Sequence, residues 1–248
     1  MSRHAAHTGI AAIGTAARPA ARGSSHDRIY REIYDAIVEQ RLAPGVTLPE
    51  DTLGQLFGVS RTVVRKALLQ LGHEQLVEIR PNRGAAVARP TVEEARQVFE
   101  ARRVVEEGIV RLFMANRPPA GLKALKAMVA DEREAHRTHD RRVAIRLAGD
   151  FHLAMADHAG NEVLAGYLRA LISRTSLIVA LYQSRVATLC SFEEHEALIA
   201  AIEDGDAERV VRDMEAHLRH LEAGLDLADR RKPVDLAQVF GRSLPGEP

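Results

Sequence analysis

The pattern of the chain changes at Arg89-Pro90-Thr91, and this change limits the folds that the sequence can adopt. Before it, three helical segments are followed by two short runs of β-forming residues around a turn. After it, every periodic segment has helical spacing, and no repeat of about 20–50 residues occurs. We therefore predict a mainly α protein of two domains, the first with three helices and a small β-wing and the second an all-helical bundle of about six helices.

Length and composition narrow the class of protein further. The 248 residues are 46% hydrophobic, which is enough for two modest cores. Residues 1–25 are rich in Ala, Arg, Gly and Ser and lack the unbroken apolar stretch of a secretory signal, so we expect a disordered arm. No run of about 18 apolar residues occurs, which argues against a membrane partner. The single cysteine, Cys190, excludes an internal disulfide framework and favours the cytoplasm.

Charge is divided unevenly between the two parts of the chain. Residues 1–90 hold 12 Lys and Arg against 8 Asp and Glu, whereas residues 91–248 hold 22 against 26. A basic front and an acidic back suit a nucleic-acid-binding module joined to another unit. An asymmetry of this size can also arise by chance, so it only supports the argument from motifs.

The elements before the change have the order of a winged helix-turn-helix. Ser24 and Ser60 are placed to cap the first and third helices, and the second is expected to bury Leu53, Leu56 and Phe57. The turn at residues 81–84 separates the two strands. The predicted helices lie at about 27–41, 50–57 and 61–74, the strands at 77–79 and 85–88, and the domain at 26–89.

The third helix carries the residue pattern of a DNA-reading helix. Arg61 and Arg65 lie four residues apart and project from the same side. The N-terminal turns of such a helix read base edges in the major groove, and the arginine fork matches the O6 and N7 acceptors of guanine. Thr62 and Lys66 suit phosphates, which position a protein without specifying sequence. The alternative for these four residues is an ordinary amphipathic helix with a solvated basic face.

The wing turn is the second predicted DNA contact. Asn82, Arg83 and Gly84 could follow the phosphate backbone or enter the minor groove, and Gly84 would allow a close approach of the chain.

Residues 28–89 resemble the DNA-binding domain of the GntR family of regulators. The resemblance implies that Arg61, Arg65 and Gly84 contact operator DNA. The chain departs from the family pattern at Gly54, where Ala is usual, and at Lys66, where Glu is usual; Lys66 adds positive charge near the groove. The matching residues are Pro44-Gly45 with Leu48, Leu53, Leu56, Gly58-Val59-Ser60-Arg61-Thr62, Arg65, Ala67-Leu68, Arg83-Gly84 and Val87.

Residues 92–228 resemble the all-helical ligand-binding domain, called FCD, of the FadR-type branch of that family. We place this domain at 92–230 and a flexible tail at 231–248. The predicted helices lie at about 92–116, 120–138, 140–159, 161–184, 191–203 and 206–229. The resemblance rests on Arg102 with Glu106, Phe151-His152, Gly160-Asn161 with Leu164, Glu194-His195, Ala201-Ile202, Gly205-Asp206-Ala207 and His217.

Many members of that branch hold a divalent metal with one Asp and three His, and His152, His195 and His217 match the three histidines. Imidazole nitrogens from three helices suit a zinc-type site with open positions. Ala148 stands where the family has the Asp, which removes one ligand. Asp150 falls on another side of its helix, and Asp213, one turn before His217, is a weak substitute. The alternative is that the three histidines line an effector pocket without metal.

Arg102 and Arg174 are the predicted effector-binding residues, because an arginine inside a bundle can clamp a carboxylate. The alternative for Arg102 is a structural ion pair with Glu106, one turn away.

These features together predict a ligand-responsive DNA-binding regulator, with a repressor favoured, and not an enzyme. We expect a homodimer that binds operator DNA with two-fold symmetry and an effector that is a small organic acid. Two other functions stay open on the sequence. One is a metal-dependent hydrolase with a regulatory winged helix, and the other is a regulator that senses zinc itself.

Overall fold

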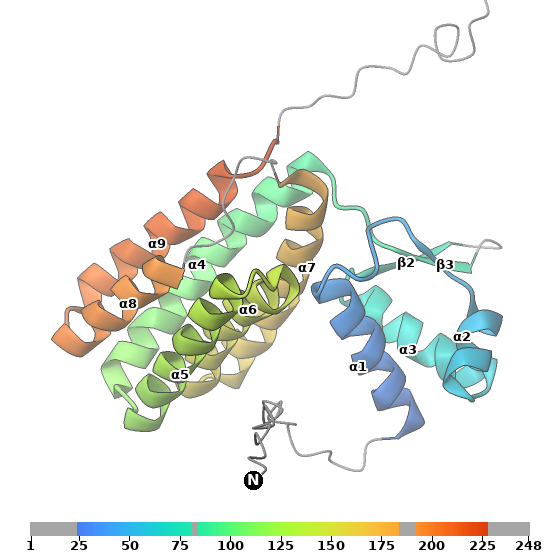
Figure 1. Ribbon diagram of the computed structural model, residues 1–248, viewed down its shortest axis with the longest axis horizontal. Helices are drawn as coiled ribbons and strands as arrows, with labels where there is room; N and C mark the ends of the chain where they lie inside the picture. The colour runs from blue at the N-terminus through green and yellow to red at the C-terminus, as the bar shows by residue number, and fades with distance from the viewer. Residues whose placement is uncertain (1–23, 81–83, 184–191, 228–248) are drawn as a thin grey trace, which may run out of the picture.

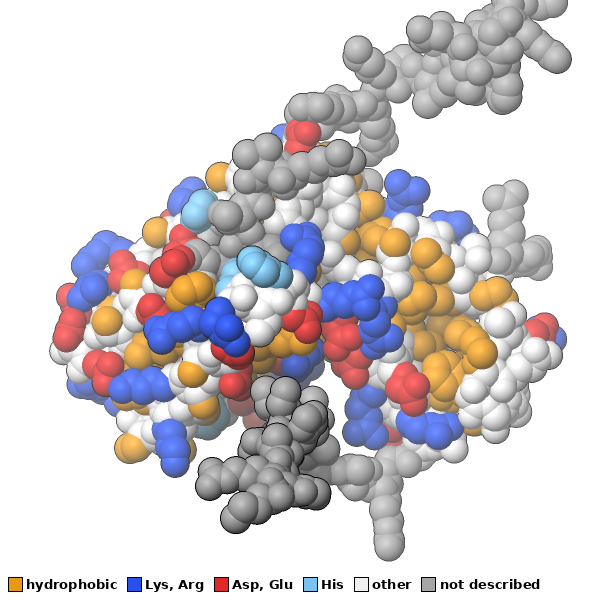
Figure 2. All heavy atoms as spheres, viewed as in Figure 1, with side chains coloured by type: hydrophobic (Ala, Val, Ile, Leu, Met, Phe, Trp, Pro, Cys, Tyr) orange, Lys and Arg blue, Asp and Glu red, His pale blue; other side chains and the backbone are white. Residues whose placement is uncertain are grey.

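The computed structural model describes residues 24–80, 84–183 and 192–227. Two parts are evident in Figure 1, a winged-helix part at the N-terminal end and a bundle of long helices. The predicted fold class, a winged helix-turn-helix followed by an all-helical bundle, is therefore confirmed. Charged side chains of both signs are interspersed over the bundle face seen in Figure 2, as is typical of solvated helices.

The winged-helix part contains three helices and a small antiparallel sheet. The sheet has the order β1-β3-β2, so β3 is central and pairs Ala86 with Thr47 on one side and Val87 with Val77 on the other. The two-residue strand β1 was not predicted because it is too short to show an alternating pattern. The elements are α1 (Ser25–Val38), β1 (Thr47–Leu48), α2 (Glu50–Phe57), α3 (Arg61–His73), β2 (Val77–Arg80) and β3 (Gly84–Val87).

Local signals set the ends of α1. Ser24 and Asp27 form a reciprocal capping box, which satisfies free backbone N–H groups at the start. The helix ends at Val38, earlier than the predicted Arg41, because Gln40 has a left-handed backbone (φ 58°) that no α-helix accommodates. Ser60 occupies the N-cap position of α3, but its side chain makes no capping hydrogen bond.

One prediction for α2 was wrong. Leu56 is exposed, whereas Leu53 and Phe57 are partly buried against the winged-helix core. The eight-residue helix packs on α3 through the side that carries Leu53 and Phe57, and Leu56 lies about 100° away from Phe57 around the helix.

The bundle consists, in the described part of the chain, of six helices, and the first five begin and end within two residues of their predicted positions. The last helix ends at Ala223, six residues before the predicted end at 229, and Gly224 occupies its C-cap position. Proline at the start of α5 and left-handed glycines at Gly160 and Gly205 mark the breaks between helices. The core is formed by residues such as Phe113, Leu125, Phe151, Leu168 and Leu198. The helices are α4 (Val92–Asn116), α5 (Pro119–Arg137), α6 (Arg141–His158), α7 (Glu162–Tyr182), α8 (Phe192–Asp204) and α9 (Ala207–Ala223).

Helix α7 joins the two parts. Its Leu177 belongs to the core of the winged-helix part, and its Ser173 hydroxyl lies 2.7 Å from the Tyr34 hydroxyl of α1. Among the described helices, α7 alone is long and apolar enough to cross a membrane by length and composition. The same helix packs against α4, α6 and α1, so its apolar character is that of a core helix.

Candidate metal and effector site

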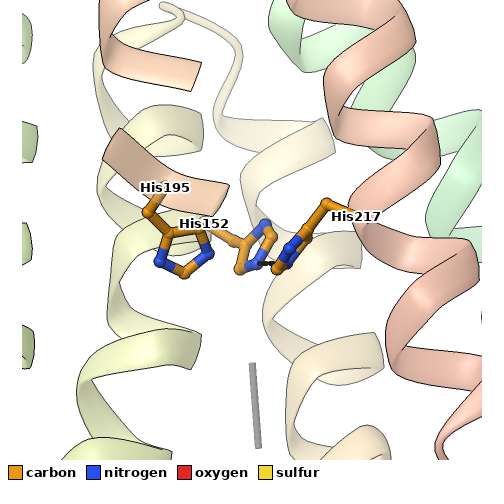
Figure 3. Close-up of side chains that lie close together, drawn as sticks. All are labelled: His152, His195 and His217. Carbon is orange, nitrogen blue, oxygen red and sulfur yellow. Dashed lines mark hydrogen bonds between the residues drawn. The ribbon is translucent and has the colours of Figure 1, made fainter. Parts of the chain in front are cut away.

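Three histidines from three helices meet inside the bundle (Figure 3). His152 of α6, His195 of α8 and His217 of α9 are all buried. One ring nitrogen from each lies within 4.8 Å of those of the other two, and the Nε2 atoms of His152 and His217 are 3.3 Å apart. The structure thus brings together the three residues that the sequence singled out.

Each of these imidazoles is oriented by its own carboxylate. Nδ1 of His152 lies 2.5 Å from Glu106, Nδ1 of His195 lies 2.8 Å from Glu132, and Nδ1 of His217 lies 2.7 Å from Glu194. Because a carboxylate accepts but does not donate, it holds the proton on Nδ1 and leaves the Nε2 lone pair facing inward. A carboxylate behind the histidine is the usual support of a metal ligand.

The inward-facing nitrogens suit a cation. Two lone pairs 3.3 Å apart repel each other unless a positive charge lies between them. Two imidazoles bound to one zinc ion at about 2.1 Å, at a tetrahedral angle, would have their nitrogens about 3.4 Å apart. The donor set therefore fits zinc or a similar divalent ion with at least one open position.

Burial and neighbouring charges keep His152 neutral and Glu106 negatively charged. Burial lowers the pKa of His152 to about 3, although Glu106 favours the charged ring. Burial alone would raise the pKa of Glu106, but the charges of Arg102 and His152 outweigh it and lower that pKa to about 2. His152 is therefore neutral and able to bind metal at physiological pH.

A small cavity opens beside His152. Its volume is about 60 Å³, which is room for a few water molecules or one end of a small acid. Ala148 and Gly149 leave this space on α6. Polar groups reach it from Arg102, His136, His152, Thr175 and Ser176, and the remaining walls are apolar.

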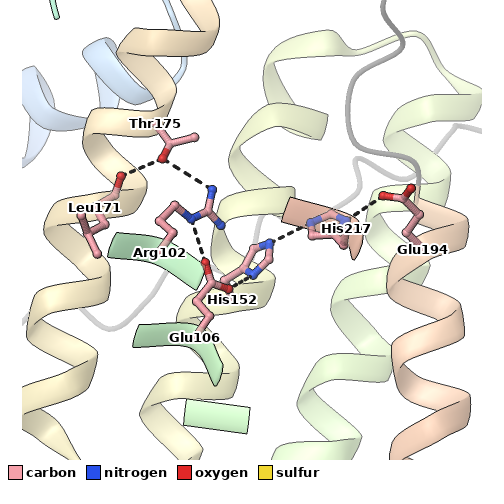
Figure 4. A network of polar contacts seen from close by, with 7 residues as sticks. All are labelled: Arg102, Glu106, His152, Leu171, Thr175, Glu194 and His217. Carbon is pink, nitrogen blue, oxygen red and sulfur yellow. Dashed lines mark hydrogen bonds and ion pairs between the residues drawn. The ribbon is translucent and has the colours of Figure 1, made fainter. Parts of the chain in front are cut away.

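Arg102 connects the cavity to the histidine cluster (Figure 4). Its Nε donates to Glu106 at 2.7 Å, and Glu106 in turn contacts His152. Its Nη1 lies 3.5 Å from the Thr175 hydroxyl. Its Nη2 is buried and has no hydrogen-bond partner among the described residues. Arg102 thus forms the predicted ion pair with Glu106 and also lines the cavity.

The other residues weighed from the sequence lie apart from the three histidines. Arg174 does not line the cavity, and its charge acts instead on the carboxyl of Glu94. Asp150 pairs with Arg146 and Asp213 with Arg209. Cys190 lies outside the described residues.

The support that Glu106, Glu132 and Glu194 give to the histidines was not predicted from the sequence, although a signal was present. Glu132 follows the buried Leu125 and Val129 at helical spacing, and Glu106 precedes the buried Ile109 in the same way. An acid on an apolar stripe must have a buried partner, because an unpaired buried charge is costly. Glu194 was noted only as part of a family motif, and Glu106 only as part of that motif and as an ion-pair partner of Arg102.

The predicted DNA-reading residues of α3 are accessible on the surface of the winged-helix part. Arg61, Thr62, Arg65 and Lys66 are all exposed on α3. Arg61 and Arg65 line an open concavity of about 580 Å³. Gly84, which has a positive φ of 76° and is the first residue of strand β3, lines the same concavity. Asn82 and Arg83 lie outside the described residues.

Two stretches of the chain match known protein families. Residues 25–87 match the model of the bacterial regulatory proteins of the gntR family, and residues 97–220 match the FCD domain. The chain belongs to the FCD branch of the GntR family. Its winged helix is therefore an operator-binding domain, and its bundle is the domain that binds a small-molecule effector.

Curated relatives of this regulator are themselves regulators. It is 28% identical over 207 residues to the HTH-type transcriptional regulator LutR of Bacillus subtilis, which covers 73% of this chain and 92% of the relative. It is 27% identical over 230 residues to the transcriptional repressor NanR of Klebsiella aerogenes, which covers 83% of this chain and 87% of the relative. These relatives are not enzymes, and the hydrolase alternative finds no support among them.

Solved structures share the whole fold. The E. coli protein McbR/YncC has a TM-score of 0.73 at 20% identity and covers 81% of this chain and 96% of its own. A GntR protein from Rhodococcus sp. RHA1 has a TM-score of 0.72 at 24% identity and covers 81% of this chain and 97% of its own.

Proposed function

We propose that this chain is a metal-dependent repressor whose affinity for operator DNA responds to a small carboxylic acid. The observation that carries the proposal is the convergence of three buried Nε2 atoms, each ring being backed by its own glutamate. His152, His195 and His217 would hold a divalent ion, zinc first. The bound ion would supply a Lewis-acidic centre that an anionic ligand can coordinate.

The effector would be a small carboxylic acid, and only its carboxylate with the adjoining atoms would enter the cavity. The cavity beside His152 has room for such a group, and Ala148 leaves space in place of a side-chain ligand. A carboxylate there would accept a hydrogen bond from Nη2 of Arg102, which is otherwise unpartnered among the described residues. Arg174 has no part in this proposal, because its side chain does not line the cavity.

The operator would be read by α3 and the wing. Arg61 and Arg65 would contact guanine edges, Thr62 and Lys66 would contact phosphates, and the wing turn with Asn82, Arg83 and Gly84 would follow the backbone. The domain boundaries of 26–89 and 92–230, with an arm at 1–25 and a tail at 231–248, stay a prediction, as does a cytoplasmic location.

A homodimer would use the face where α4 and α7 lie side by side. Gly108 of α4 lies close to Leu164 of α7, and near this crossing Val104, Val163 and Tyr167 are large apolar side chains that remain exposed. Large apolar side chains that remain exposed are candidates for a protein interface. Sedimentation of wild type and Tyr167→Glu tests this, since a dimer in both would place the interface elsewhere.

Helix α7 would carry the signal between the two parts. One side of α7 supplies Thr175 and Ser176 to the cavity, and another side supplies Ser173 and Leu177 to the winged-helix part. A ligand that shifts α7 would therefore shift the placement of α1, and with it the spacing of the two reading helices in a dimer.

The proposal is tested by the effect of small acids on operator binding. The operator is first selected by the wild-type protein from a pool of randomised duplexes, and its affinity is then measured by fluorescence anisotropy. Lactate, pyruvate, succinate and citrate are compared with neutral amides of similar size. At least one acid should change operator affinity about fivefold or more, and chelation should abolish the response. Operator affinity that is unchanged by every acid at millimolar concentration would overturn the proposal.

A further inference from the structure

The reading arginines of α3 face two acidic residues of α2. Arg61 Nε lies 3.0 Å from Asp51 Oδ1, and the Glu50 carboxylate lies 3.9 Å from Arg61 and 4.0 Å from Arg65. All four residues line the same concavity as the start of the wing. Both acids occupy the first turn of α2, where the helix dipole stabilises negative charge. Acids on a surface that binds a polyanion need an explanation.

We propose that Asp51 is a specificity-determining residue that acts through Arg61. The inference rests on the proposed role of Arg61 in reading guanine. A guanidinium group has five N–H donors in a rigid fork. When Asp51 takes Nε, the N–H groups of the two terminal nitrogens of Arg61 remain, and these are the donors that match the O6 and N7 of guanine. Glu50 lies 3.9 Å from one of these nitrogens, Nη2, which is too far for a hydrogen bond. Asp51 thus orients the arginine without using its base-reading end.

The same carboxylate discriminates against binding through phosphates alone. Non-specific affinity comes almost entirely from the attraction of basic groups to the phosphate backbone. Asp51 is 66% exposed, so it would face an approaching duplex and repel the phosphates. A guanine edge carries no net charge, so a specific complex gains the oriented arginine while a non-specific complex has only the repulsion. The carboxylate therefore raises the ratio of specific to non-specific affinity.

The test compares Asp51→Ala and Asp51→Asn with wild type on two duplexes. One is the operator selected from randomised duplexes, and the other is an unrelated duplex of the same length and base composition. Glu93→Ala is the matched control, because Glu93 is also a first-turn acid of similar exposure, 69%, but lies on α4. Arg61→Ala identifies the base pair that Arg61 reads, because discrimination between bases is lost at that position of the operator. Circular dichroism and melting temperature verify folding.

Both Asp51 variants should bind the unrelated duplex more tightly, and their ratio of operator to unrelated affinity should fall about threefold or more. Asp51→Ala should also discriminate less at the base pair read by Arg61, whereas Glu93→Ala should behave as wild type. A ratio within twofold of wild type in both Asp51 variants would overturn the inference while leaving the reading helix intact. If Arg61→Ala itself keeps full operator affinity, the proposed role of Arg61 is wrong and the inference falls with it.

Discussion

The hydroxyl of Tyr34 on α1 lies 2.7 Å from the hydroxyl of Ser173 on α7, so one hydrogen bond joins the winged helix to the helix that lines the effector cavity. Ser173 also donates to the Arg169 carbonyl within α7, which leaves its oxygen to accept from Tyr34. The contact is largely buried, and it lies two residues from Thr175. It is the most direct polar connection that we find between the two parts in the described residues.

Tyr34→Phe should therefore weaken communication between cavity and DNA. The variant loses one hydrogen bond, worth about 1 kcal/mol, and should show a smaller change of operator affinity on addition of an effector acid. Zinc affinity should be unchanged, because Tyr34 lies outside the histidine cluster. The measurement is the ratio of operator dissociation constants with and without the acid.

Tyr30→Phe is the control for this prediction. Tyr30 stacks on Tyr34 and its hydroxyl donates to Glu74 at 2.6 Å, entirely within the winged-helix part. Its loss should cost similar stability but leave the effector response intact. Equal responses in Tyr34→Phe and wild type would mean that the signal takes another route.

Ala148→Asp should strengthen metal binding. Ala148 lies one turn before His152 on α6 and lines the same cavity, so a carboxylate there can reach an ion held by the three histidines. Changes to groups that merely support metal ligands shift affinity about 10–100-fold, so an added ligand should raise zinc affinity by roughly tenfold or more.

Calorimetric titration of zinc into chelator-treated protein measures this effect. Ala148→Asn is the matched control, because it has the same shape without the charge and should raise affinity far less. The added carboxylate should also reduce the response to effector acids by occupying their position. Equal zinc affinity in Ala148→Asp and wild type would show that the cavity does not adjoin the metal.

Acid should destabilise the metal-free protein from about pH 6.5 downward. In the unfolded chain a histidine binds a proton below pH 6.5, whereas burial lowers the pKa of His152 to about 3 in the folded protein. Between these values the unfolded state holds more protons, so the free energy of unfolding falls as the pH falls, by up to ~1.4 kcal/mol per pH unit for one proton.

Glu106 adds to this loss at lower pH. Although burial opposes it, the charges of Arg102 and His152 lower the pKa of Glu106 to about 2, so its contribution disappears as the pH falls from 4.5 towards that value. Denaturant unfolding of chelated protein at pH 7.5, 6.5, 5.5 and 4.5 measures the slope due to His152, and further points at pH 4 and 3.5 measure the added slope due to Glu106. Stability that rises on acidification would contradict a neutral, buried His152.

Two substitutions on α3 should separate base reading from phosphate binding. Arg65→Ala should cost about 1–3 kcal/mol on the operator and relax specificity at one base pair, because the arginine fork is lost. Lys66→Ala should weaken operator and unrelated duplexes alike and reduce the slope of log affinity against log salt by about one. Anisotropy titrations at several salt concentrations distinguish the two effects. The roles are reversed if Lys66→Ala changes specificity and Arg65→Ala does not.

Periodicity and breakers were enough to predict the order and approximate ends of the helices. The apolar stripes and the signals at Pro119, Gly160 and Gly205 are local, so they can be recognised without a structure. What could not be predicted depends on contacts between distant segments. The pairing of β1 with β3 joins residues 37 and 39 positions apart, and Leu56 is exposed because α2 packs on α3 through another side.

The residues of the candidate site likewise include some that could be predicted from the sequence and some that depend on tertiary contacts. The resemblance to the FCD domain identified the three histidines, but their spacing alone does not reveal that Glu106 and Glu132, from two other helices, hold two of the rings. Arg102 and Arg174 are both single arginines in helical segments, and only tertiary packing places the first at the cavity and the second near Glu94. Likewise, the contact of Asp51 with Arg61 depends on how α2 and α3 meet.

The metal content of His217→Ala and His220→Ala, compared with wild type, tests the central claim most directly. Both histidines contact the same Glu194 carboxylate, but His217 is buried in the cluster and His220 is 63% exposed outside it. His217 is preferred to His195 for substitution, because removal of His195 would leave the fully buried Glu132 without its partner.

Untagged proteins are loaded with zinc, dialysed and measured by elemental mass spectrometry. The account predicts about one zinc ion per chain in wild type and His220→Ala and less than about a tenth of that in His217→Ala. No retained metal in wild type, or equal retention in His217→Ala, would contradict a metal site built from the three histidines.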